Sequence, residues 1–357
     1  MNKYYYEKKV IKMKKIISLI LFLVICFSFV SCKNENNQPE KPTDQQEENM
    51  TPESTQNEEV STIHIASLKG PTSMGLVGLY NKSDNGELTY TLDYSINGAA
   101  DEISPLLING DLDGAAVPAN LASVLYNKTG GNIVVAAINT FGVLYIVETG
   151  DSIQSISDLK GKKIYSTGKG TTPEYALDFL LENNGIDPDK DVTIDFASEA
   201  TEVSTLLTED KSGNAVAVLP QPYVTAALAQ NDGLRIAISF ADEWEKVTSD
   251  SKLVTGVFVF NKQFAESNPN LISSFLKDYS ESVDFAKNDT DGAAALIEQY
   301  GIVAKAPIAK KALPFCNIDF VVGNEMKETL SGYLQTLYDK NPAAVGGTLP
   351  SDEFYYE

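Results

Sequence analysis

The sequence predicts an α/β protein of two lobes, each built on a mostly parallel β-sheet flanked by helices. The first observation is length, because 357 residues are enough for two domains of ordinary size. The second is the alternation of strand-like and helix-like runs from Thr62 onward, which is typical of parallel sheets covered by helices. The third is a pair of long β-rich runs, 133–147 and 253–260, which are suited to cross between the lobes.

The first lobe begins with the strand TIHIAS and a glycine-rich turn into a helix, GPTSMGLVGLYN. The strand LTYTLDYS and the helix ADEISPLLING follow, and then the short strand GAAVP and the helix ANLASVLYNKTG. The run IVVAAINTFGVLYIV is expected to bend at 139–142. We therefore assign residues 62–145 to the first lobe.

The second lobe continues the alternation over residues 146–249. After the strand in KKIYSTG comes a helix, PEYALDFLLENNG, in which Leu177, Leu180 and Leu181 share a face and Gly185 marks the end. DVTIDFA, NAVAVL and LRIAISF are further strands, with EVSTLLTED and PYVTAALAQNDG as the helices between them. TGVFVFNKQF then returns as a strand to the first lobe, and three or four helices without another strong strand complete residues 250–357.

The N-terminal sequence predicts a secretion signal. Five lysines between Lys8 and Lys15 precede the apolar run Ile16–Val30, whose 15 residues are short for a membrane span. Ser31 and Cys32 follow, so residues 1–31 resemble a bacterial lipoprotein signal peptide. That resemblance implies a lipid on Cys32 that anchors the protein to the cell membrane, facing outside the cytoplasm. Residues 32–61 are polar and acidic, and they predict a disordered tether.

Composition excludes several classes of function. A net charge of −21 at pH 7 would repel phosphate backbones, so nucleic acid is not an expected partner. Besides Cys32, the processed chain keeps only Cys316, which we expect to be a buried small residue rather than part of a disulfide. His64 is the only histidine, and no metal-ligand spacing or nucleophile elbow is present. We expect no enzyme activity, no metal and no cofactor.

Two glycine-rich turns are the main candidates for a binding site. GKGTT fits neither the P-loop nor the dinucleotide fingerprint, yet it joins a strand to a helix that we expect to start at Pro173 with Thr172 as its cap. Free N–H groups at such a turn can hold a ligand. GPTSMG is its counterpart in the first lobe, and ligands of open α/β sheets bind beyond strand C-termini. The candidate residues of the two turns are Gly70, Pro71, Thr72, Ser73, Met74, Gly168, Lys169, Gly170, Thr171 and Thr172.

Other polar segments also follow strand ends and are expected to line the cleft between the lobes. They contribute the candidates Asn97, Gly98, Pro118, Asn120, Asn139, Thr140, Glu199, Pro220 and Gln221. Each of these positions is equally compatible with an ordinary loop, and Glu199 with a helix start favoured by the helix dipole. Trp244, the only tryptophan, could stack on a ligand or pack near the hinge.

The single arginine limits the kind of ligand. Arg235 opens a strand and therefore lies at the end away from the expected site. A guanidinium clamp for a carboxylate or sulfonate is thus disfavoured. Backbone N–H groups, hydroxyls and Lys169 remain for an anion, and a neutral heterocycle fits equally well.

Four segments resemble solute-binding proteins of the nitrate, sulfonate, taurine and thiamine-precursor type, which have a periplasmic-binding-protein type II-like fold. They are GDLDGAAVPANLASVLYNK, LKGKKIYSTGKGTTPEYALDFLLENNGIDPDKDVTIDF, AVLPQPYVTAAL and TGVFVFNKQFAESNPNLISSFLKDYSESVDFAKND. The resemblance implies a monomer that captures a small solute by hinge closure and delivers it to an ABC permease. Alternatives are an enzyme of the same fold in cofactor-precursor synthesis, which the secretion signal disfavours, and a ligand-sensing partner of a membrane receptor.

Overall fold

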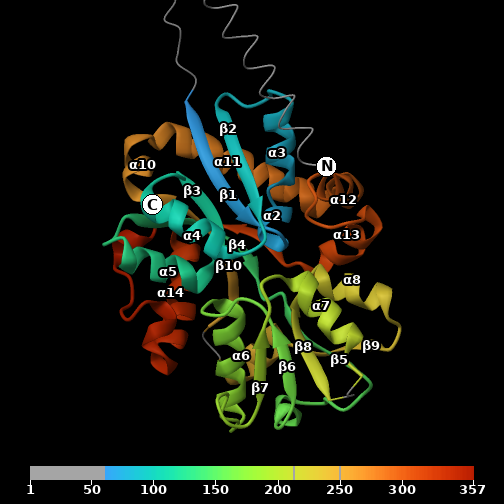
Figure 1. The fold of residues 1–357 in the computed structure, drawn as a ribbon. Helices are drawn as coiled ribbons and strands as arrows, with labels where there is room; N and C mark the ends of the chain where they lie inside the picture. The colour runs from blue at the N-terminus through green and yellow to red at the C-terminus, as the bar shows by residue number, and fades with distance from the viewer. Residues whose placement is uncertain (1–60, 212–213, 249–250) are drawn as a thin grey trace, which may run out of the picture. The chain divides into compact units, whose positions relative to one another are not determined.

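The computed structural model describes residues 61–211, 214–248 and 251–357. The expected signal peptide, lipidation at Cys32 and all but the last residue of the expected tether lie outside these residues. The described chain forms two β-sheets, each with its own helices, and Figure 1 shows one sheet above the other. None of the described helices is both long and apolar enough to span a membrane.

The first sheet has six strands in the order β11-β4-β10-β3-β1-β2. β1 pairs in parallel with β2 and β3, whereas β10 is antiparallel to β3 and β4, and β11 is antiparallel to β4. The bounds are Thr62–Leu68 for β1, Thr91–Asn97 for β2, Gly114–Pro118 for β3, Ile133–Phe141 for β4, Val254–Asn261 for β10 and Ile318–Val321 for β11.

The second sheet has five strands in the order β7-β6-β8-β5-β9. β6 pairs in parallel with β7 and β8, and β5 is antiparallel to both β8 and β9. The bounds are Leu144–Thr149 for β5, Lys163–Ser166 for β6, Thr193–Phe196 for β7, Ala215–Pro220 for β8 and Leu234–Ser239 for β9.

Helices and short 3-10 turns connect and cover both sheets (Figure 1). Those of the second-sheet segment are η1 (Ile156–Leu159), α6 (Thr172–Asn183), α7 (Ala200–Glu209), α8 (Tyr223–Gln230) and α9 (Phe240–Val247). The others are α2 (Pro71–Met74), α3 (Val77–Asp84), α4 (Ala100–Asn109), α5 (Ala119–Lys128), α10 (Lys262–Ser267), α11 (Pro269–Asn288), α12 (Thr290–Gln299), α13 (Ala306–Ala312), η2 (Leu313–Phe315), α14 (Gly323–Lys340), η3 (Pro342–Val345) and η4 (Asp352–Phe354).

The α/β prediction is confirmed, with mixed sheets. The strands that run against their neighbours are β5, β10 and β11. β5 and β10 each follow a passage from one sheet to the other. The chain enters the new sheet at the strand ends that face the other sheet, so the entering strand must run away from that other sheet. The first passage is short, because β4 ends at Phe141 and β5 begins at Leu144.

Two local expectations are wrong. α6 begins at Thr172 with Thr171 as its N-cap residue, one position before the predicted cap, because proline is tolerated throughout the first turn of a helix. The C-terminal segment also contains a strand, β11, and five α-helices instead of three or four. The predicted apolar face of α6 is confirmed, since Leu177, Leu180 and Leu181 are all buried.

Candidate functional site

The two sheets meet along an inter-sheet face, which we define as the strand ends and turns that follow β1–β4 and β6–β8. Contacts from α6 and from α8 cross it. Thr172, at the start of α6, places its Oγ1 3.2 Å from Oδ1 of Asn120 in α5. Tyr223 of α8 directs its hydroxyl to the backbone oxygen of Lys69, 3.5 Å away, at the limit of a hydrogen bond. The turns of the two sheets are therefore in contact in this structure.

A group of buried polar side chains lies at the end of β4 and the start of β10. Asn139 is 1% exposed and Thr140 is fully buried. Both polar atoms of the Asn139 side chain, the Thr140 hydroxyl and the Thr255 hydroxyl have no hydrogen-bond partner among the described residues. Leaving such groups unpaired in a protein interior costs about 1–3 kcal/mol each. We call Asn139, Thr140 and Thr255 the polar cluster.

Gly256 brings this cluster together with the first glycine-rich turn. It pairs with Pro118 on β3 and Thr140 on β4. A Cβ atom on Gly256 would lie 2.5 Å from Asn139 Oδ1 and 2.7 Å from Cγ2 of Thr72, so only glycine fits. Thr72, on the turn after β1, therefore lies over the same point as the polar cluster.

Tyr279 of α11 adds a third unpaired buried hydroxyl next to the cluster. Burial raises the pKa of Tyr279 far above its ordinary value, and the nearby Asn139 side chain opposes this in part. The two side chains are thus neighbours, although no pair of their atoms has hydrogen-bond geometry. Tyr279, Thr255 and Gly256 were not predicted. A threonine–glycine pair inside the apolar strand VTGVFVF was the available signal for the last two.

The hydroxyls of the GPTSMG turn bond within the protein, and that of Thr72 donates to Leu68 O at 3.0 Å. Ser73 is fully buried, and its hydroxyl lies 2.8 Å from that of Ser67, which also contacts Tyr80. Ser73 donates a further hydrogen bond to Leu68 O. Met74 is fully buried against Cys316, and Gly70 and Pro71 are buried too. Of the five candidates in this turn, Thr72 is the one that the structure places at the polar cluster.

The GKGTT turn presents fewer free N–H groups than its sequence predicts. Gly168 and Gly170 have φ angles of +72° and +75°, which favour glycine. The Gly170 N–H donates to the Glu174 carboxylate, and the Thr171 hydroxyl donates to Gly168 O. Lys169 is exposed, with its Nζ 5.8 Å from the centre of the Phe196 ring.

Thr172 is buried in a chain of polar contacts at the inter-sheet face. Its Oγ1 contacts Asn120, as described above, and also accepts a hydrogen bond from the Tyr333 hydroxyl at 3.3 Å. Asn120 in turn donates to Ala344 O at 2.9 Å. All three side chains are fully buried. Thr172 and Asn120 therefore join the two halves of the molecule to each other.

The remaining candidates lie along the rim of the inter-sheet face. Glu199 is exposed, and its carboxylate is so close to Gly98 that a Cβ on that glycine would lie 2.6 Å from Oε1. Asn97 accepts a hydrogen bond from Ser95 through Oδ1, and Gln221 accepts one from the Thr225 hydroxyl. Pro118 and Pro220 end strands that pair with β10 and β5. Burial, with the charge of Glu199, raises the pKa of Tyr223 to about 12.

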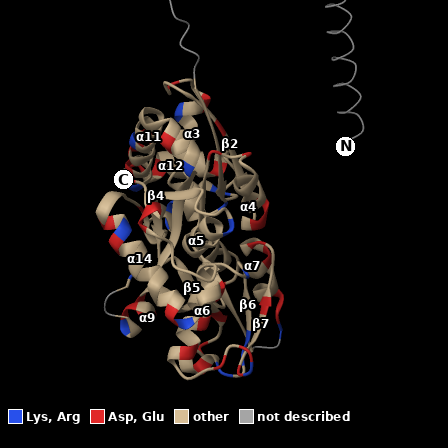
Figure 2. Cartoon of the chain, turned by 90° about the vertical axis from the view of Figure 1, so that its left-hand side faces the viewer, with Lys and Arg blue, Asp and Glu red and all other residues tan. Residues whose placement is uncertain are grey.

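Three helix starts at the inter-sheet face share one capping arrangement. In each, the backbone N–H just before the helix donates to a glutamate four residues later. The pairs are Gly98 with Glu102 at α4, Gly170 with Glu174 at α6 and Ser198 with Glu202 at α7. Carboxylates are favoured there by the helix dipole. Figure 2 shows acidic residues at α4 and α7, where the two sheets face each other.

Arg235 lies at the far end of the second sheet, as the sequence predicts. It pairs with Glu148 and donates to the backbone oxygens of Gly150 and Ile153. Burial raises the pKa of Glu148, but hydrogen bonds from Ile153, Ser152 and Arg235 outweigh it and hold that pKa below its ordinary value. The Arg235 guanidinium is thus bound to groups of the protein itself.

Trp244, His64 and Cys316, which the sequence analysis also named, all make contacts within the fold. Trp244 is fully buried between Phe179 and Tyr333, with ring centroids 4.3 and 5.6 Å away. His64 pairs with Asp113 at 3.0 Å and is exposed. Cys316 is fully buried, and burial raises the pKa of its thiol well above the ordinary value.

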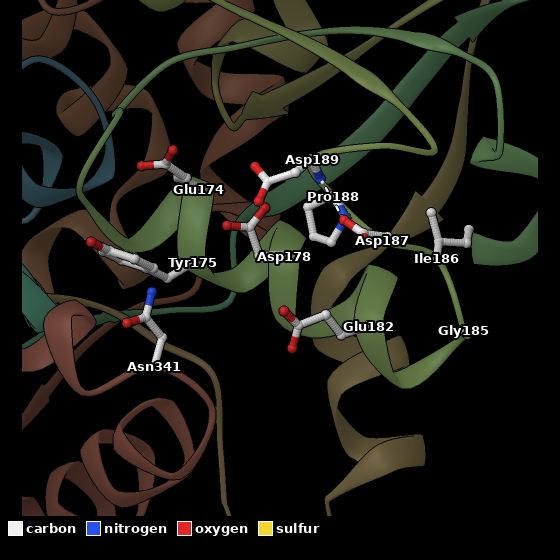
Figure 3. Close-up of a pocket in the computed structure, with 10 residues that line it drawn as sticks. All are labelled: Glu174, Tyr175, Asp178, Glu182, Gly185, Ile186, Asp187, Pro188, Asp189 and Asn341. Atoms are coloured by element: carbon white, nitrogen blue, oxygen red, sulfur yellow. Dashed lines mark hydrogen bonds between the residues drawn. The ribbon is translucent and has the colours of Figure 1, made fainter.

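An acidic pocket of about 640 Å³ lies against α6 and is lined in part by Glu174, which also caps the start of that helix (Figure 3). Glu174, Asp178 and Glu182 project from the helix, and Asp187 and Asp189 lie on the loop that follows it. No group of side chains in the described part of the chain could hold a metal ion. The pocket therefore shows a concentration of negative charge without the arrangement of a metal site.

The two mixed sheets, joined by short passages and facing each other through their strand ends, define a periplasmic-binding-protein fold. A family model described as NMT1/THI5 like matches residues 96–293, more than half of the chain, and the chain belongs to that family. No curated protein matches.

Solved structures show the same fold. An ABC transporter protein from Parabacteroides distasonis is 24% identical, with a TM-score of 0.67, covering 83% of this chain and 99% of its own. The periplasmic aliphatic sulphonate binding protein SsuA from Escherichia coli is 17% identical, with a TM-score of 0.65 and coverage of 83% and 92%. The periplasmic nitrate-binding protein NrtA from Synechocystis is 13% identical, with a TM-score of 0.55 and coverage of 67% and 66%.

Proposed function

We propose that this chain is the solute-binding component of an ABC importer, which captures a small solute outside the cytoplasm and presents it to a membrane permease. The observation that carries the proposal is the polar cluster, whose hydrogen-bonding groups are buried at the inter-sheet face and unpaired within the described chain. A solved protein of this fold from Staphylococcus aureus, described as the ligand binding component of an ABC-type import system, supports it.

Capture occurs by hinge closure. The lobes, 62–145 with 250–357 and 146–249, rotate about the two passages between the sheets. A solute that enters the open form meets Thr72, Asn139, Thr140 and Thr255 from the first lobe. Closure then brings the α6 and α8 starts onto it, where Thr172 and Tyr223 already contact the first lobe in the structure. A ligand that favours the closed form shifts the population toward it.

Binding rather than catalysis fits the chemistry of the site. The cluster consists of a carboxamide and hydroxyls, none of them next to a base that could activate a nucleophile. His64 lies near the start of β1 and pairs with Asp113, which directly precedes β3, so both lie at the opposite end of these strands from the inter-sheet face. The protein acts as a monomer without enzyme activity.

The proposal is tested by solute binding and small-angle scattering on the full chain. We expect one class of small solute to raise Tm, since a ligand at one hundred times its Kd stabilises the fold by about 2.7 kcal/mol. The same solute should reduce the radius of gyration. Failure of every solute to raise Tm, together with no small molecule released on denaturation, would contradict the proposal. Tight binding without compaction would contradict hinge closure alone.

We also propose that Cys32 carries the lipid that holds the protein at the outer side of the cell membrane, followed by the acidic tether of residues 32–61. Cys32→Ser removes the acylated thiol, so we expect the variant to appear in the medium or to keep its signal peptide. Cys316→Ser is the matched control and should stay in the membrane fraction. Membrane fractionation and intact mass measure both. A Cys32→Ser protein that still carries lipid contradicts this anchor.

A further inference from the structure

We propose that the solute is uncharged and presents a hydrogen-bond donor beside an acceptor, as a cyclic amide does. This inference rests on the proposed solute-binding function and names the solute class. It starts from Asn139, whose Nδ2 and Oδ1 are both buried and both unpaired within the described residues. A carboxamide offers donors on one atom and an acceptor on the other.

An anion leaves part of this site unsatisfied. Nitrate and sulfonates carry acceptors only, so they can pair with Asn139 Nδ2 and the hydroxyls of Thr140 and Thr255. Asn139 Oδ1 then stays buried without a donor, which costs about 1–3 kcal/mol. A solute edge that combines N–H and C=O satisfies both ends of the same side chain.

Three of the helix starts at the inter-sheet face carry negative charge instead of offering a positive site to an anion. The N–H groups of Gly98, Gly170 and Ser198 are already donated to Glu102, Glu174 and Glu202. Each of these starts therefore carries a carboxylate that would repel an anion. The three caps occupy α4, α6 and α7, from both sheets.

A charged solute of either sign also lacks a buried counter-charge. Among the described residues Glu148 is the only buried charged side chain, and it is paired with Arg235 at the opposite end of the second sheet. Burying an unpaired charge costs far more than burying an uncharged polar group. The site therefore selects against cations as well, in spite of the acidic rim.

The test compares probes of different charge on the full chain purified in detergent. Uracil and 2-pyrrolidone are the uncharged cyclic amides, nitrate and methanesulfonate the anions, and choline the cation. We expect at least one cyclic amide to raise Tm and to give a calorimetric Kd, with no shift for the charged probes. Asn139→Asp, which replaces the donor by a carboxylate, should weaken that binding on the order of ten-fold or more. Asn270→Asp makes the same change on the exposed face of α11 and should leave the Kd unchanged.

The outcomes separate this inference from the proposed function. Binding of nitrate, methanesulfonate or choline in place of the cyclic amides overturns the uncharged class and leaves solute binding intact. Cyclic-amide binding that Asn139→Asp does not weaken overturns the assignment of Asn139. If no probe binds and denaturation releases no small molecule, the inference fails together with the function on which it rests.

Discussion

Among the residues that the structure describes, Asp178 is the carboxyl group whose environment most disfavours its charge. It projects from α6 into the acidic pocket and is half-buried there (Figure 3). Burial, reinforced by the charges of Glu174, Glu182 and Asp189, raises its pKa to about 7. An unfolded aspartate titrates near 3.9. Between these two values the folded state binds a proton that the unfolded state does not, so this group lowers stability as pH rises from about 4 to 7.

Asp178→Asn should therefore stabilise the protein in a pH-dependent way. The raised pKa corresponds to an upper bound of about 4 kcal/mol, and solvent screening at a half-buried group reduces this to roughly 1–2 kcal/mol. We expect that gain at pH 8 and convergence with the parent protein near pH 4. Denaturant unfolding at both pH values measures it. Asp284→Asn, at an exposed position of α11, is the control and should give no gain at either pH. An equal effect of the two variants would show that burial among the pocket carboxylates does not cause the gain.

At the level of elements, the sequence predicts the positions of strands and helices more accurately than it predicts which strands pair and in which direction. Apolar runs such as IVVAAIN become strands because every residue from Ile133 to Thr140 is buried. The direction of β5 and β10 depends on the end of the sheet at which the chain enters, and no local sequence pattern encodes this. β11 is four residues long and includes Asp319, and its pairing with β4 rather than its composition makes it a strand.

The same distinction between local pattern and long-range pairing applies to the residues of the candidate site. The rule that ligands bind beyond strand ends led to Thr72, Asn139 and Thr140, which the structure brings together. Gly256 joins them only because β10 inserts between β3 and β4, a pairing across more than one hundred residues of sequence. The capping role of Glu174 was readable from its spacing to Gly170, and it changes the GKGTT turn from a set of free donors into a capped helix start. Which residues touch solute stays a prediction.

At the level of the whole molecule, one buried polar chain connects the two halves. Thr172 belongs to α6 beside the second sheet, whereas its partners Asn120 and Tyr333 belong to α5 and α14, which contact β4 and β10 of the first sheet. Trp244 packs on Tyr333 in the same region. These side-chain contacts between the two halves involve no solute.

Thr172→Val should shift the free protein toward an open form. Valine has nearly the same shape but leaves Asn120 Oδ1 and the Tyr333 hydroxyl without their partner, at a cost of about 1–3 kcal/mol. Opening the lobes gives both groups access to water, so part of this cost is relieved in the open form. We expect a larger radius of gyration in small-angle scattering without solute and a lower Tm. Thr205→Val removes an exposed hydroxyl of α7 and should change neither. If Thr172→Val keeps the radius of gyration of that control, the hydrogen bonds of Thr172 do not hold the lobes together, and closure depends on solute alone.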